Sequence, residues 1–464
     1  MNQKEEWTKS RKFFIILIDL LLFIGSLLLS FRLRYGANIP IRNLEAFKGS
    51  IIYVSIGFII VSILFGTYIL YNKSVSDFLF ITIIGQVVVS LYIMALTFAG
   101  RWLAFPRSVI LIHFFVGCIV LFTWRVLVFK VYQKLSGSKR VMIVGMEKEV
   151  FAAVDNFSNT KSIRHVVSHV VLSDYYENVK SHLNDIDIVY LASQIEESEK
   201  LRIYDLLMRE DKKFFLNTSF ENLVMVNPNM MNIEDESIIE VSPFRIASED
   251  GIIKRLIDIV FSLLLIIVSS PIMAVAAILV KQSSEGPILY KQTRITKDGK
   301  EFEILKFRSM GITAEKESGP VLATSNDMRV TPVGKYLRSL RIDELPQLFN
   351  VLKGDMSIVG PRPERPFFVD QFKEENPHYY LRHNVRAGIT GYAQVYGKYA
   401  SDFNSKLNFD LIYIKEYSLI LDLKIMLQTV KILFDKVSSR GLDETERTMH
   451  SEQELIAKGI KVIH

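Results

Sequence analysis

The chain contains almost no cysteine. Cys118 is the only one among 464 residues, so an intramolecular disulfide and a thiolate metal cage are both excluded. The eight histidines form neither an HExxH nor an HxH pattern, which removes two common signatures of metal-binding sites. Hydrophobic residues make up 49% of the chain, and this share excludes a disordered or collagen-like protein.

A glycine-rich phosphate loop is missing as well. Residues 139–245 alternate apolar strands with polar helical stretches, which predicts a small, doubly wound, Rossmann-like α/β domain. Its expected strands are Lys139–Gly145, Asp187–Ala192 and Lys213–Leu216. After Gly145 the sequence continues Met-Glu-Lys-Glu, without the further glycines that let a backbone approach a pyrophosphate. We therefore expect a structural role for this domain rather than nucleotide binding.

The excess of positive charge is small. Lysine and arginine number 56 and aspartate and glutamate 50, which gives a formal net charge of +6. Such a balance suits an anionic lipid surface or an anionic substrate better than a protein that reads DNA sequence. We expect no nucleic-acid partner.

Long apolar runs are abundant in the first third of the chain. Each has about the 20 residues needed to cross a bilayer, and together they predict a four-helix transmembrane region over residues 1–135: Phe13–Leu33, Ile51–Tyr71, Phe78–Ala99 and Val109–Tyr132. Asp19 in the first run is costly in a membrane unless it is paired, and an ion pair with an arginine such as Arg125 is favoured. The first run lacks a small-residue cleavage site and is expected to be retained. Lysines and arginines beyond the first and last runs favour a cytoplasmic location for both ends.

A fifth apolar run, Ile252–Val280, differs from the others because Ser270 and Pro271 lie in its middle. Proline removes a helical N–H donor and predicts a kink, and nearby serine hydroxyls can bond to the carbonyls that it leaves unpaired. The run is either a plain fifth span or a re-entrant helix that enters and leaves on one face. We favour the re-entrant helix over residues 252–280.

The chemistry of the chain is concentrated after Glu285. Asp343 and Glu344 precede a short predicted helix that Pro346 begins and Gly354 ends, where the helix dipole favours anions. Taken alone, such an acidic pair is usually solvated surface charge. Basic residues that could bind phosphate lie nearby in sequence, although a solvated surface is an equal alternative for each: Lys306, Arg308 and Arg362. Weaker candidates are Arg386, in a loop with two glycines, and two further acids, Asp410 and Asp422.

From about Lys254 to Phe434 these blocks resemble the bacterial polyprenyl-phosphate hexose-1-phosphate transferases, also called bacterial sugar transferases or monotopic phosphoglycosyl transferases. The four upstream spans and the α/β domain resemble the large form of that family. The motifs are long and follow in order: Lys-Arg-x-x-Asp, Ser-Pro, Gly-Pro-x-x-Tyr-Lys-Gln, Lys-Phe-Arg-Ser-Met, Asp-Glu-Leu-Pro-Gln-Leu-x-Asn-Val-Leu-Lys-Gly-Asp-Met-Ser, Gly-Pro-Arg-Pro-Glu and Gly-Ile-Thr-Gly-x-Ala-Gln-Val. The resemblance implies an α/β-type monotopic catalytic domain over residues 251–437, with its re-entrant membrane helix, followed by a polar, peripheral tail over 438–464.

The resemblance also implies a reaction. Asp343 would attack the β-phosphate of a UDP-sugar, release UMP and hold the phosphosugar until undecaprenyl phosphate accepts it, and Glu344 would bind Mg²⁺. Ser270 and Pro271 would set the kink that holds the site at the lipid surface. The cations expected to bind substrate phosphate are Lys306, Arg308, Arg341, Arg362 and Lys398, the last in place of a family arginine.

This reaction would start capsule, exopolysaccharide or O-antigen synthesis at the bacterial cytoplasmic membrane, with the catalytic domain facing the cytoplasm. The large family form also implies a homodimer. Two alternatives stay open on the residues themselves. One is a metal-dependent glycosyltransferase that acts on a polyprenyl-linked acceptor and releases UDP, and the other is a non-catalytic membrane scaffold of polysaccharide assembly.

Overall fold

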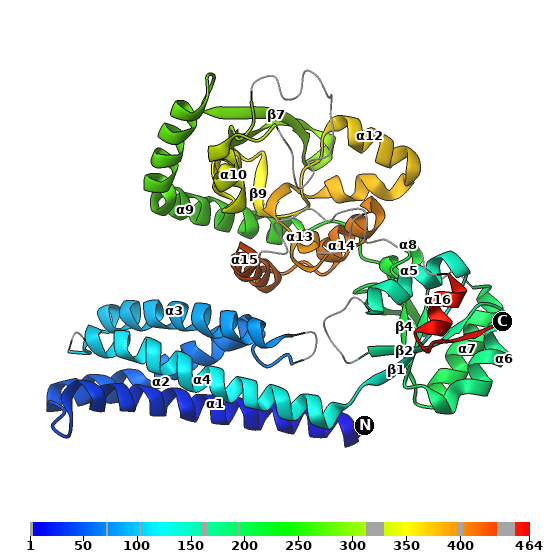
Figure 1. The fold of residues 1–464 in the computed structure, drawn as a ribbon, viewed down its shortest axis with the longest axis horizontal. Coiled ribbons are helices and arrows are strands. Elements are labelled where there is room, and N and C mark those ends of the chain that lie inside the picture. Colours follow the sequence, from blue (N-terminus) through cyan, green and yellow to red (C-terminus); the bar gives the residue numbers. More distant parts are fainter. Residues whose placement is uncertain are drawn as a thin grey trace. The chain divides into compact units, whose positions relative to one another are not determined.

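The computed structural model describes residues 3–70, 73–102, 104–158, 165–192, 195–311, 329–397, 402–433 and 451–464. The chain divides into two compact units (Figure 1). The first consists of Met1–Asn217 together with Met449–His464, and the second of Thr218–Thr448. In sequence, the second unit is therefore inserted into the first.

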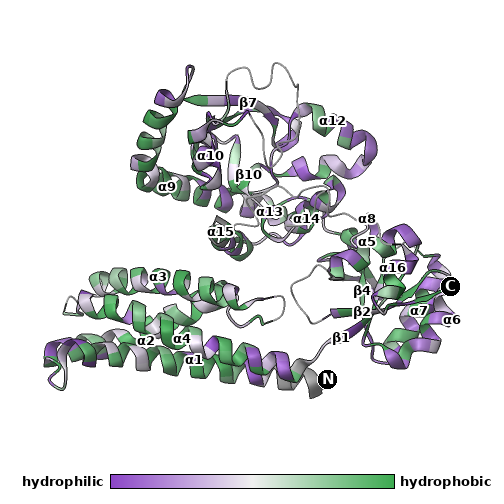
Figure 2. Ribbon diagram, viewed as in Figure 1, coloured by the Kyte–Doolittle hydropathy of each residue, from purple (hydrophilic) through white to green (hydrophobic). Residues whose placement is uncertain are grey.

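Four long helices open the first unit and match the four predicted spans. They are α1 (Gln3–Tyr35), α2 (Ile41–Leu64), α3 (Val75–Ala99) and α4 (Arg107–Ser136). All four are long and apolar enough to cross a membrane, and Figure 2 shows hydrophobic residues along most of their length. α2 differs from the predicted span Ile51–Tyr71 at both ends, because it begins at Ile41, directly after Pro40 at the N-cap, and ends at Leu64.

An ion pair lies buried among these helices. The Asp19 carboxylate on α1 accepts a hydrogen bond from Arg125 Nη2 on α4 at 2.9 Å, which confirms the predicted pair. Tyr68 donates to the same carboxylate oxygen at 3.2 Å, and Arg125 Nη1 donates to Thr82 on α3 at 3.0 Å. Because lipid offers no hydrogen-bond partners, these contacts join α1, α3 and α4 through groups that would be costly to separate.

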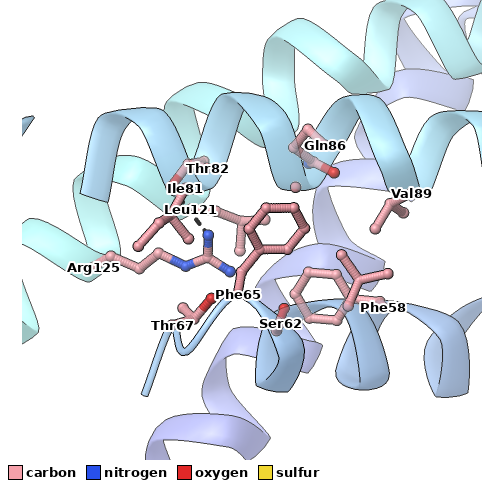
Figure 3. A pocket seen from close by; sticks show the side chains of 12 residues that line it. Phe58, Ser62, Phe65, Thr67, Ile81, Thr82, Gln86, Val89, Leu121 and Arg125 are labelled. Atoms are coloured by element: carbon pink, nitrogen blue, oxygen red, sulfur yellow. Dashed lines mark hydrogen bonds between the residues drawn. The ribbon is translucent and has the colours of Figure 1, made fainter. Parts of the chain in front are cut away.

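A small cavity lies beside Arg125, the cationic member of this pair (Figure 3). It measures about 10 Å³, and Thr67, Gln86 and Arg125 are among its lining residues. Gln86 is 2% exposed. A Cβ atom at Gly117 would come within 2.0 Å of its amide nitrogen, so the glycine makes room for the glutamine. The bundle therefore buries a polar cluster in addition to the hydrophobic core that includes Phe23 and Leu27.

The α/β domain that follows is built on a five-stranded parallel sheet in the order β11-β2-β1-β3-β4. Alternate residues of β1 pack into two separate hydrophobic clusters, Val141 and Ile143 in one, Met142 and Val144 in the other. Helices α5 and α16 contribute to the first cluster and α6 and α7 to the second, so helices cover both faces. The bounds are β1 Lys139–Val144, α5 Glu147–Ser158, β2 His165–Val171, α6 Tyr175–His182, β3 Ile188–Leu191, α7 Glu197–Arg209, β4 Lys213–Leu216, α16 Glu452–Ala457 and β11 Lys461–Ile463.

The end of the described chain belongs to this domain and differs from the peripheral tail that the sequence suggested. β11 pairs with β2 in parallel, and Leu455 of α16 is completely buried. Ile460 is 6% exposed in the same cluster. Isolated apolar residues in a polar stretch and a strand of three residues give no periodic pattern, which is why the sequence did not reveal this element. Residues 438–450 of the predicted tail lie outside the described residues.

The second unit contains a long helix, two hairpins and a small parallel sheet. Its main elements are α9 (Ser248–Ser283), the antiparallel pair β7 (Leu289–Ile295) and β8 (Glu301–Phe307), and the parallel pair β9 (Met356–Val359) and β10 (Ala387–Thr390). The others are α8 Phe220–Val224, β5 Asn229–Ile233, β6 Glu236–Glu240, α10 Pro332–Ser339, α11 Gln347–Lys353, α12 Pro366–Glu375, α13 Tyr392–Tyr396, α14 Phe403–Lys415 and α15 Leu419–Leu433, with 3₁₀ turns η2 at Lys297–Gly299, η3 at Ile342–Glu344 and η4 at Pro377–Asn384.

Both arms of α9 pack on this unit. In the first arm, Asp258 accepts hydrogen bonds from the Ser357 hydroxyl at 3.1 Å and from the Ile358 N–H at 3.0 Å, both on β9. In the second arm, Ala276 and Val280 pack in a cluster with residues of β8 and α10. The stretch between them is exposed and apolar, and Figure 1 shows the two arms running in different directions.

The kink predicted for α9 depends on the proline in the interior of this helix. Pro271 lies inside the helix and has no N–H for the carbonyl of Ile267, four residues earlier. The Ser270 hydroxyl donates to that carbonyl at 2.8 Å. The expectation that a neighbouring serine satisfies the carbonyl is therefore confirmed.

Candidate active site

The adjacent acids Asp343 and Glu344 lie in η3, between α10 and α11. Arg341 just before them adopts a left-handed conformation with φ of 54°, which turns the chain between the two helices. The helix that follows has Pro346 at its N-terminal boundary and ends at Gly354, whose φ is 101°. Asp343 is buried, with 8% of its surface exposed. The local turn thus places two neighbouring carboxylates inside the protein.

Three cations surround Glu344. Lys306 Nζ, from the end of β8, lies 3.0 Å from Glu344 Oε1. Arg362 Nη2, from the segment after β9, lies 3.1 Å from the same oxygen. Arg341 Nη1 is 3.9 Å from the other oxygen, Oε2. Three of the five predicted phosphate-binding cations therefore meet at one carboxylate, although they come from well-separated parts of the sequence.

The two carboxylates have different environments. Burial and, to a smaller extent, the charge of Glu344 together raise the pKa of Asp343 to about 6, against the opposing effect of nearby cations. Burial would also raise the pKa of Glu344, but Lys306, Arg362 and Arg341 outweigh it and hold that pKa well below its usual range. Glu344 is therefore always an anion, whereas Asp343 changes its charge near neutral pH.

Arg308 was expected beside Lys306, and the structure places it elsewhere. It is 6% exposed and donates to the carbonyls of Ser284 (2.7 Å), Glu285 and Val280 (3.4 Å) at the end of α9. β8 ends at Phe307, so the alternation that would bring positions 306 and 308 to one face stops before Arg308. This arginine caps a helix rather than facing the acidic pair.

The weaker candidates are likewise engaged elsewhere in the second unit. Asp410 forms a buried ion pair with Arg382 at 2.8 Å. Asp422 pairs with Lys254 of α9, and Arg386 Nε donates to the Gly354 carbonyl at 3.0 Å. These contacts hold elements together and do not involve the Asp343–Glu344 pair. Lys398 lies outside the described residues.

Comparison with known proteins gives this site its context. The model of the family described as bacterial sugar transferase matches residues 249–436, which include α9 and the acidic pair. The UDP-glucose:undecaprenyl-phosphate glucose-1-phosphate transferase of Caulobacter vibrioides is 43% identical over 187 residues, which are 39% of this chain and 69% of that protein. This chain belongs to the bacterial sugar transferase family.

Two larger relatives match over the same share of the chain. One is the UDP-N-acetylgalactosamine-undecaprenyl-phosphate N-acetylgalactosaminephosphotransferase of Aeromonas hydrophila, 48% identical over 191 residues, which are 40% of this chain and 45% of the relative. The other is the UDP-glucose:undecaprenyl-phosphate glucose-1-phosphate transferase of Klebsiella pneumoniae, 46% identical over 184 residues, 39% of each protein. The matched segment therefore spans less than half the length of these two sugar transferases.

A magnesium ion fits the donor set of this site only in part. Among the described residues no group of three or more His, Cys, Asp and Glu side chains could hold a metal. Glu344 Oε1 already accepts from Lys306 and Arg362, whereas Oε2 has Arg341 at 3.9 Å. Mg²⁺ is commonly bound by one or two carboxylates together with substrate phosphates and water. The pair Asp343–Glu344 suits that mode and not an all-protein cage.

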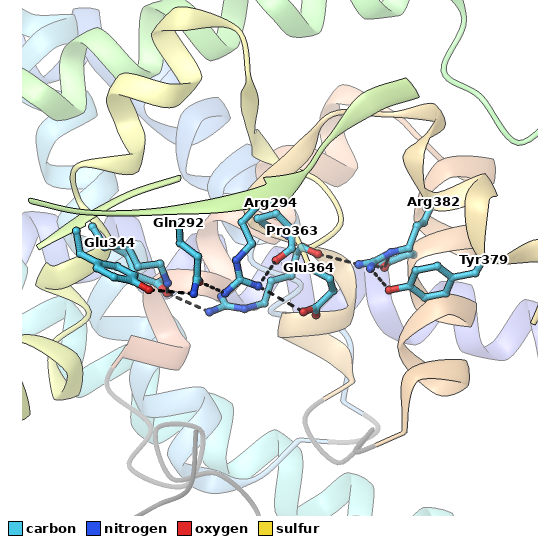
Figure 4. A network of polar contacts seen from close by, with 11 residues as sticks. Gln292, Arg294, Glu344, Pro363, Glu364, Tyr379 and Arg382 are labelled. Atoms are coloured by element: carbon cyan, nitrogen blue, oxygen red, sulfur yellow. Dashed lines mark hydrogen bonds and ion pairs between the residues drawn. The ribbon is translucent and has the colours of Figure 1, made fainter. Parts of the chain in front are cut away.

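Sequence reasoning included Tyr290 and Gln292 in a motif but assigned no role to the set of polar residues that they form with Arg294 (Figure 4). Tyr290, Gln292 and Arg294 lie on one face of β7, and Gln292 donates to the Tyr290 hydroxyl at 3.0 Å. Arg294 Nη2 donates in turn to Gln292 Oε1 at 2.7 Å. The sequence contains no signal for this face, because Lys291 and Thr293 on the opposite face of the strand are polar as well.

Proposed function

We propose that this chain transfers a sugar 1-phosphate from a UDP-sugar to undecaprenyl phosphate and releases UMP. The observation that carries the proposal is the buried Asp343 carboxylate next to Glu344, whose own carboxylate lies within 4 Å of the cations Lys306, Arg362 and Arg341. Relatives named for the transfer of N-acetylgalactosamine phosphate and glucose 1-phosphate support both the reaction and these two sugars as first candidates.

The reaction proceeds in two steps through one covalent intermediate on Asp343. An oxygen of the Asp343 carboxylate bonds to the β-phosphorus, and the bond from that phosphorus to the bridging oxygen breaks, so UMP leaves with the bridging oxygen. A phosphate oxygen of undecaprenyl phosphate then bonds to the same phosphorus and Asp343 departs as a carboxylate. Splitting one difficult displacement in two is the advantage of covalent catalysis.

The cations of the site stabilise the charge that develops on the transferred group. Lys306 and Arg362 lie within hydrogen-bond distance of Glu344, where phosphate oxygens would also come near them. Glu344 would hold magnesium, which would supply further positive charge near the transferred phosphate when bound. Arg308 takes no part in this proposal, because it caps α9.

The membrane arrangement is the second part of the proposal. We infer that α9 enters and leaves the cytoplasmic membrane on the cytoplasmic face. A straight helix of 36 residues would be about 54 Å long. Its two ends nevertheless pack on one unit, while the exposed apolar middle leaves a surface suited to lipid. The role in starting capsule, exopolysaccharide or O-antigen synthesis, and a homodimer, stay predictions.

Nucleotide release tests the reaction. The purified full chain is incubated with Mg²⁺, undecaprenyl phosphate and a panel that includes UDP-glucose and UDP-N-acetylgalactosamine, and UMP and UDP are separated by chromatography. We expect UMP from at least one donor, and loss of more than about 10³-fold in Asp343→Asn because the nucleophile is gone. Asp298→Asn, in the β7–β8 turn where a left-handed φ of 59° suits asparagine, serves as the matched control.

Each outcome of this assay favours one reading. UDP in place of UMP would contradict the covalent route and favour a metal-dependent glycosyltransferase. Turnover that survives in Asp343→Asn would contradict the role of the nucleophile. A chain that releases neither nucleotide from any donor would favour the scaffold.

Cysteine labelling tests the course of α9. In a Cys118→Ser background, Ser248→Cys and Gln282→Cys place single thiols at the two exposed ends of the helix. An impermeant maleimide applied to sealed inside-out vesicles should label both positions to the same extent. Labelling of one position alone would show that α9 spans the membrane.

A further inference from the structure

The segment Pro361–Glu364 is bound to its surroundings at every carbonyl. The Pro361 carbonyl accepts a hydrogen bond from the N–H of Gly388 at 2.9 Å, and the Glu364 carbonyl accepts one from the N–H of Ile295 at 3.0 Å. The Arg362 carbonyl accepts a hydrogen bond from Arg382 Nη2 at 2.9 Å, and the Pro363 carbonyl accepts one from Arg294 Nη1 at 3.1 Å. The two prolines of the segment have no N–H with which to join a sheet, so its position depends on these acceptors.

Arg382 is itself fixed on all sides. It is 5% exposed, and its Nε donates to Asp410 Oδ2 at 2.9 Å. Its Nη1 donates to the Tyr379 hydroxyl, which leaves Nη2 for both Asp410 and the carbonyl of Arg362. Figure 4 shows this guanidinium between Tyr379 and the segment. A buried carboxylate thus orients the arginine that holds the backbone at Arg362.

Arg294 approaches the segment from the side of β7. Its guanidinium lies between Gln292, the carbonyl of Pro363 and the Glu364 carboxylate, which is 3.6 Å away (Figure 4). The two arginines therefore bind consecutive carbonyls from different elements, Arg294 from β7 and Arg382 from η4. The first of these two carbonyls belongs to Arg362, whose side chain is 43% exposed.

We propose that Arg294 and Arg382 are positioning residues that fix the backbone at Arg362 and thereby keep its guanidinium at Glu344. A long, partly exposed side chain loses rotamer entropy when it is held in one place, and a rigid backbone with proline on both sides removes part of the remaining freedom. Displacing a group in an active site by about 1 Å can cost a factor of about 100 in rate. This inference rests on the proposed function, in which Arg362 contacts the substrate phosphate.

Arginine is required at both positions because each side chain connects acceptors that lie in different directions. Lysine keeps the positive charge but has a single ammonium in place of the planar fork. Arg382→Lys retains a charge to pair with Asp410 and loses the geometry that also reaches the Arg362 carbonyl. The substitution therefore separates the ion pair from the positioning contact.

A double-mutant cycle tests the proposal with the full chain. Arg382→Lys and Arg294→Lys are each measured alone and combined with Arg362→Ala, with kcat/KM for UMP release as the readout. We expect each lysine variant alone to lose about 10- to 100-fold, and less than about 3-fold when Arg362 is already alanine. Equal losses in both backgrounds would overturn the proposal, because a general loss of stability would not depend on Arg362.

Arg255→Lys is the matched control for the cycle. Arg255 also donates to two consecutive carbonyls, those of Val351 and Leu352 at 2.6 and 2.8 Å, but these end α11 and not the segment that carries Arg362. Whatever Arg255→Lys costs alone, it should cost the same factor in the Arg362→Ala background. A coupling as strong as that of Arg382 would contradict a specific role of the two positioning residues.

A structure of the Arg382→Lys variant separates this proposal from the proposed function. Cryo-electron microscopy should show the Arg362 guanidinium beyond hydrogen-bond distance of Glu344, and a contact still near 3 Å would overturn the positioning role. Silence of the unchanged chain with every UDP-sugar would contradict the proposed function. The positioning role would then be tested by the structure alone, through the position of the Arg362 guanidinium in the Arg382→Lys variant.

Discussion

At the scale of single residues, two adjacent carboxylates acquire opposite properties from their surroundings. Burial beside the Glu344 anion raises the pKa of Asp343. The charges of Lys306 and Arg362, in contrast, hold the pKa of Glu344 below its usual range. Neighbouring acids with pKa values pushed apart are suited to different tasks in one reaction. The sequence shows the pair but not this division, because the division comes from cations supplied by distant segments.

The first prediction concerns pH. Because the nucleophile must be ionised, kcat/KM for UMP release should fall about tenfold per pH unit below the Asp343 pKa of about 6. Arg338 is among the cations that lower this pKa, so Arg338→Gln should move the acid limb to higher pH. A pH–rate profile between pH 5 and 8 measures both. A limb that does not move in the variant would contradict the assignment to Asp343.

The second prediction concerns stability. The folded-state pKa of Asp343, about 6, exceeds its ordinary value of 3.8, so the folded protein binds this proton more tightly than the unfolded chain. Above pH 6 the ionised carboxylate therefore destabilises the fold by about 1 to 3 kcal/mol, and this cost declines as pH falls through 6. Asp343→Asn should melt above the unchanged chain at pH 7.5, with a smaller difference at pH 4.5, by thermal denaturation. If the difference in melting temperature were the same at both pH values, the ionised Asp343 carboxylate would not be the cause of the destabilisation.

Much of the candidate site could be predicted from the sequence, because its motifs bring the right residue types close together. Lys306, Arg341 and Arg362 do meet at Glu344. Arg308 could not be placed, because its direction depends on where β8 ends. Arg294 and Arg382 were missed because their partners are backbone carbonyls, which have no signature in the sequence.

At the scale of elements, an apolar helix is fixed by the few polar residues it buries. The Lys-Arg-x-x-Asp motif of α9 reaches three partners, since Lys254 pairs with Asp422, Arg255 caps α11 and Asp258 bonds to β9. The same rule holds in the membrane bundle, where the Asp19–Arg125 ion pair joins α1 to α4. Polar contacts specify how such helices pack, because lipid cannot replace them.

The third prediction tests that ion pair. Arg125→Ala leaves the fully buried Asp19 without its counter-ion and should destabilise the bundle by about 3 to 5 kcal/mol. The double variant Asp19→Asn, Arg125→Gln should recover part of the loss because no charge then remains buried. Heat treatment in detergent followed by size-exclusion chromatography measures the surviving fraction.

An exposed pair provides the control for this measurement. Arg209 and Asp205 are also 2.9 Å apart, but their side chains are 75% and 58% exposed. Arg209→Ala should therefore change stability by less than about 1 kcal/mol. Equal losses at the two sites would show that burial does not set the strength of the inner pair.

Elements were predictable where their patterns are long. The four spans, and the strands β1, β3 and β4, follow from continuous apolar runs. β2 was missed because His165, Ser168 and His169 interrupt its apolar residues. The strand becomes evident only through its partners β1 and β11, which lie far apart in the chain.

At the scale of the whole molecule, the α/β domain is discontinuous in sequence. Its first four strands precede the second unit and its edge strand β11 follows it. The helix before that strand, α16, contributes Leu455 to the core. The family match, which ends at residue 436, gives no sign of this connection.

The fourth prediction follows from that connection. Leu455→Ala should destabilise the α/β domain by about 2 to 4 kcal/mol, because it empties a fully buried position. Ile456→Ala, at a neighbouring side chain that is 57% exposed, should change stability by less than about 1 kcal/mol. Limited proteolysis should then cut within residues 139–217 sooner in the first variant than in the second. Similar cleavage in both would contradict the burial of α16.

The interruption of the α/β domain also sets an order of events during synthesis. The ribosome makes β1 to β4 first, then the entire second unit, and only afterwards the strand that covers the outer edge of β2. Until then β2 has an unpaired edge, which is a site for non-native association. A nascent chain that stalls within the second unit would therefore keep this edge uncovered, and chaperones or quality-control proteases could distinguish it from a chain that has reached β11.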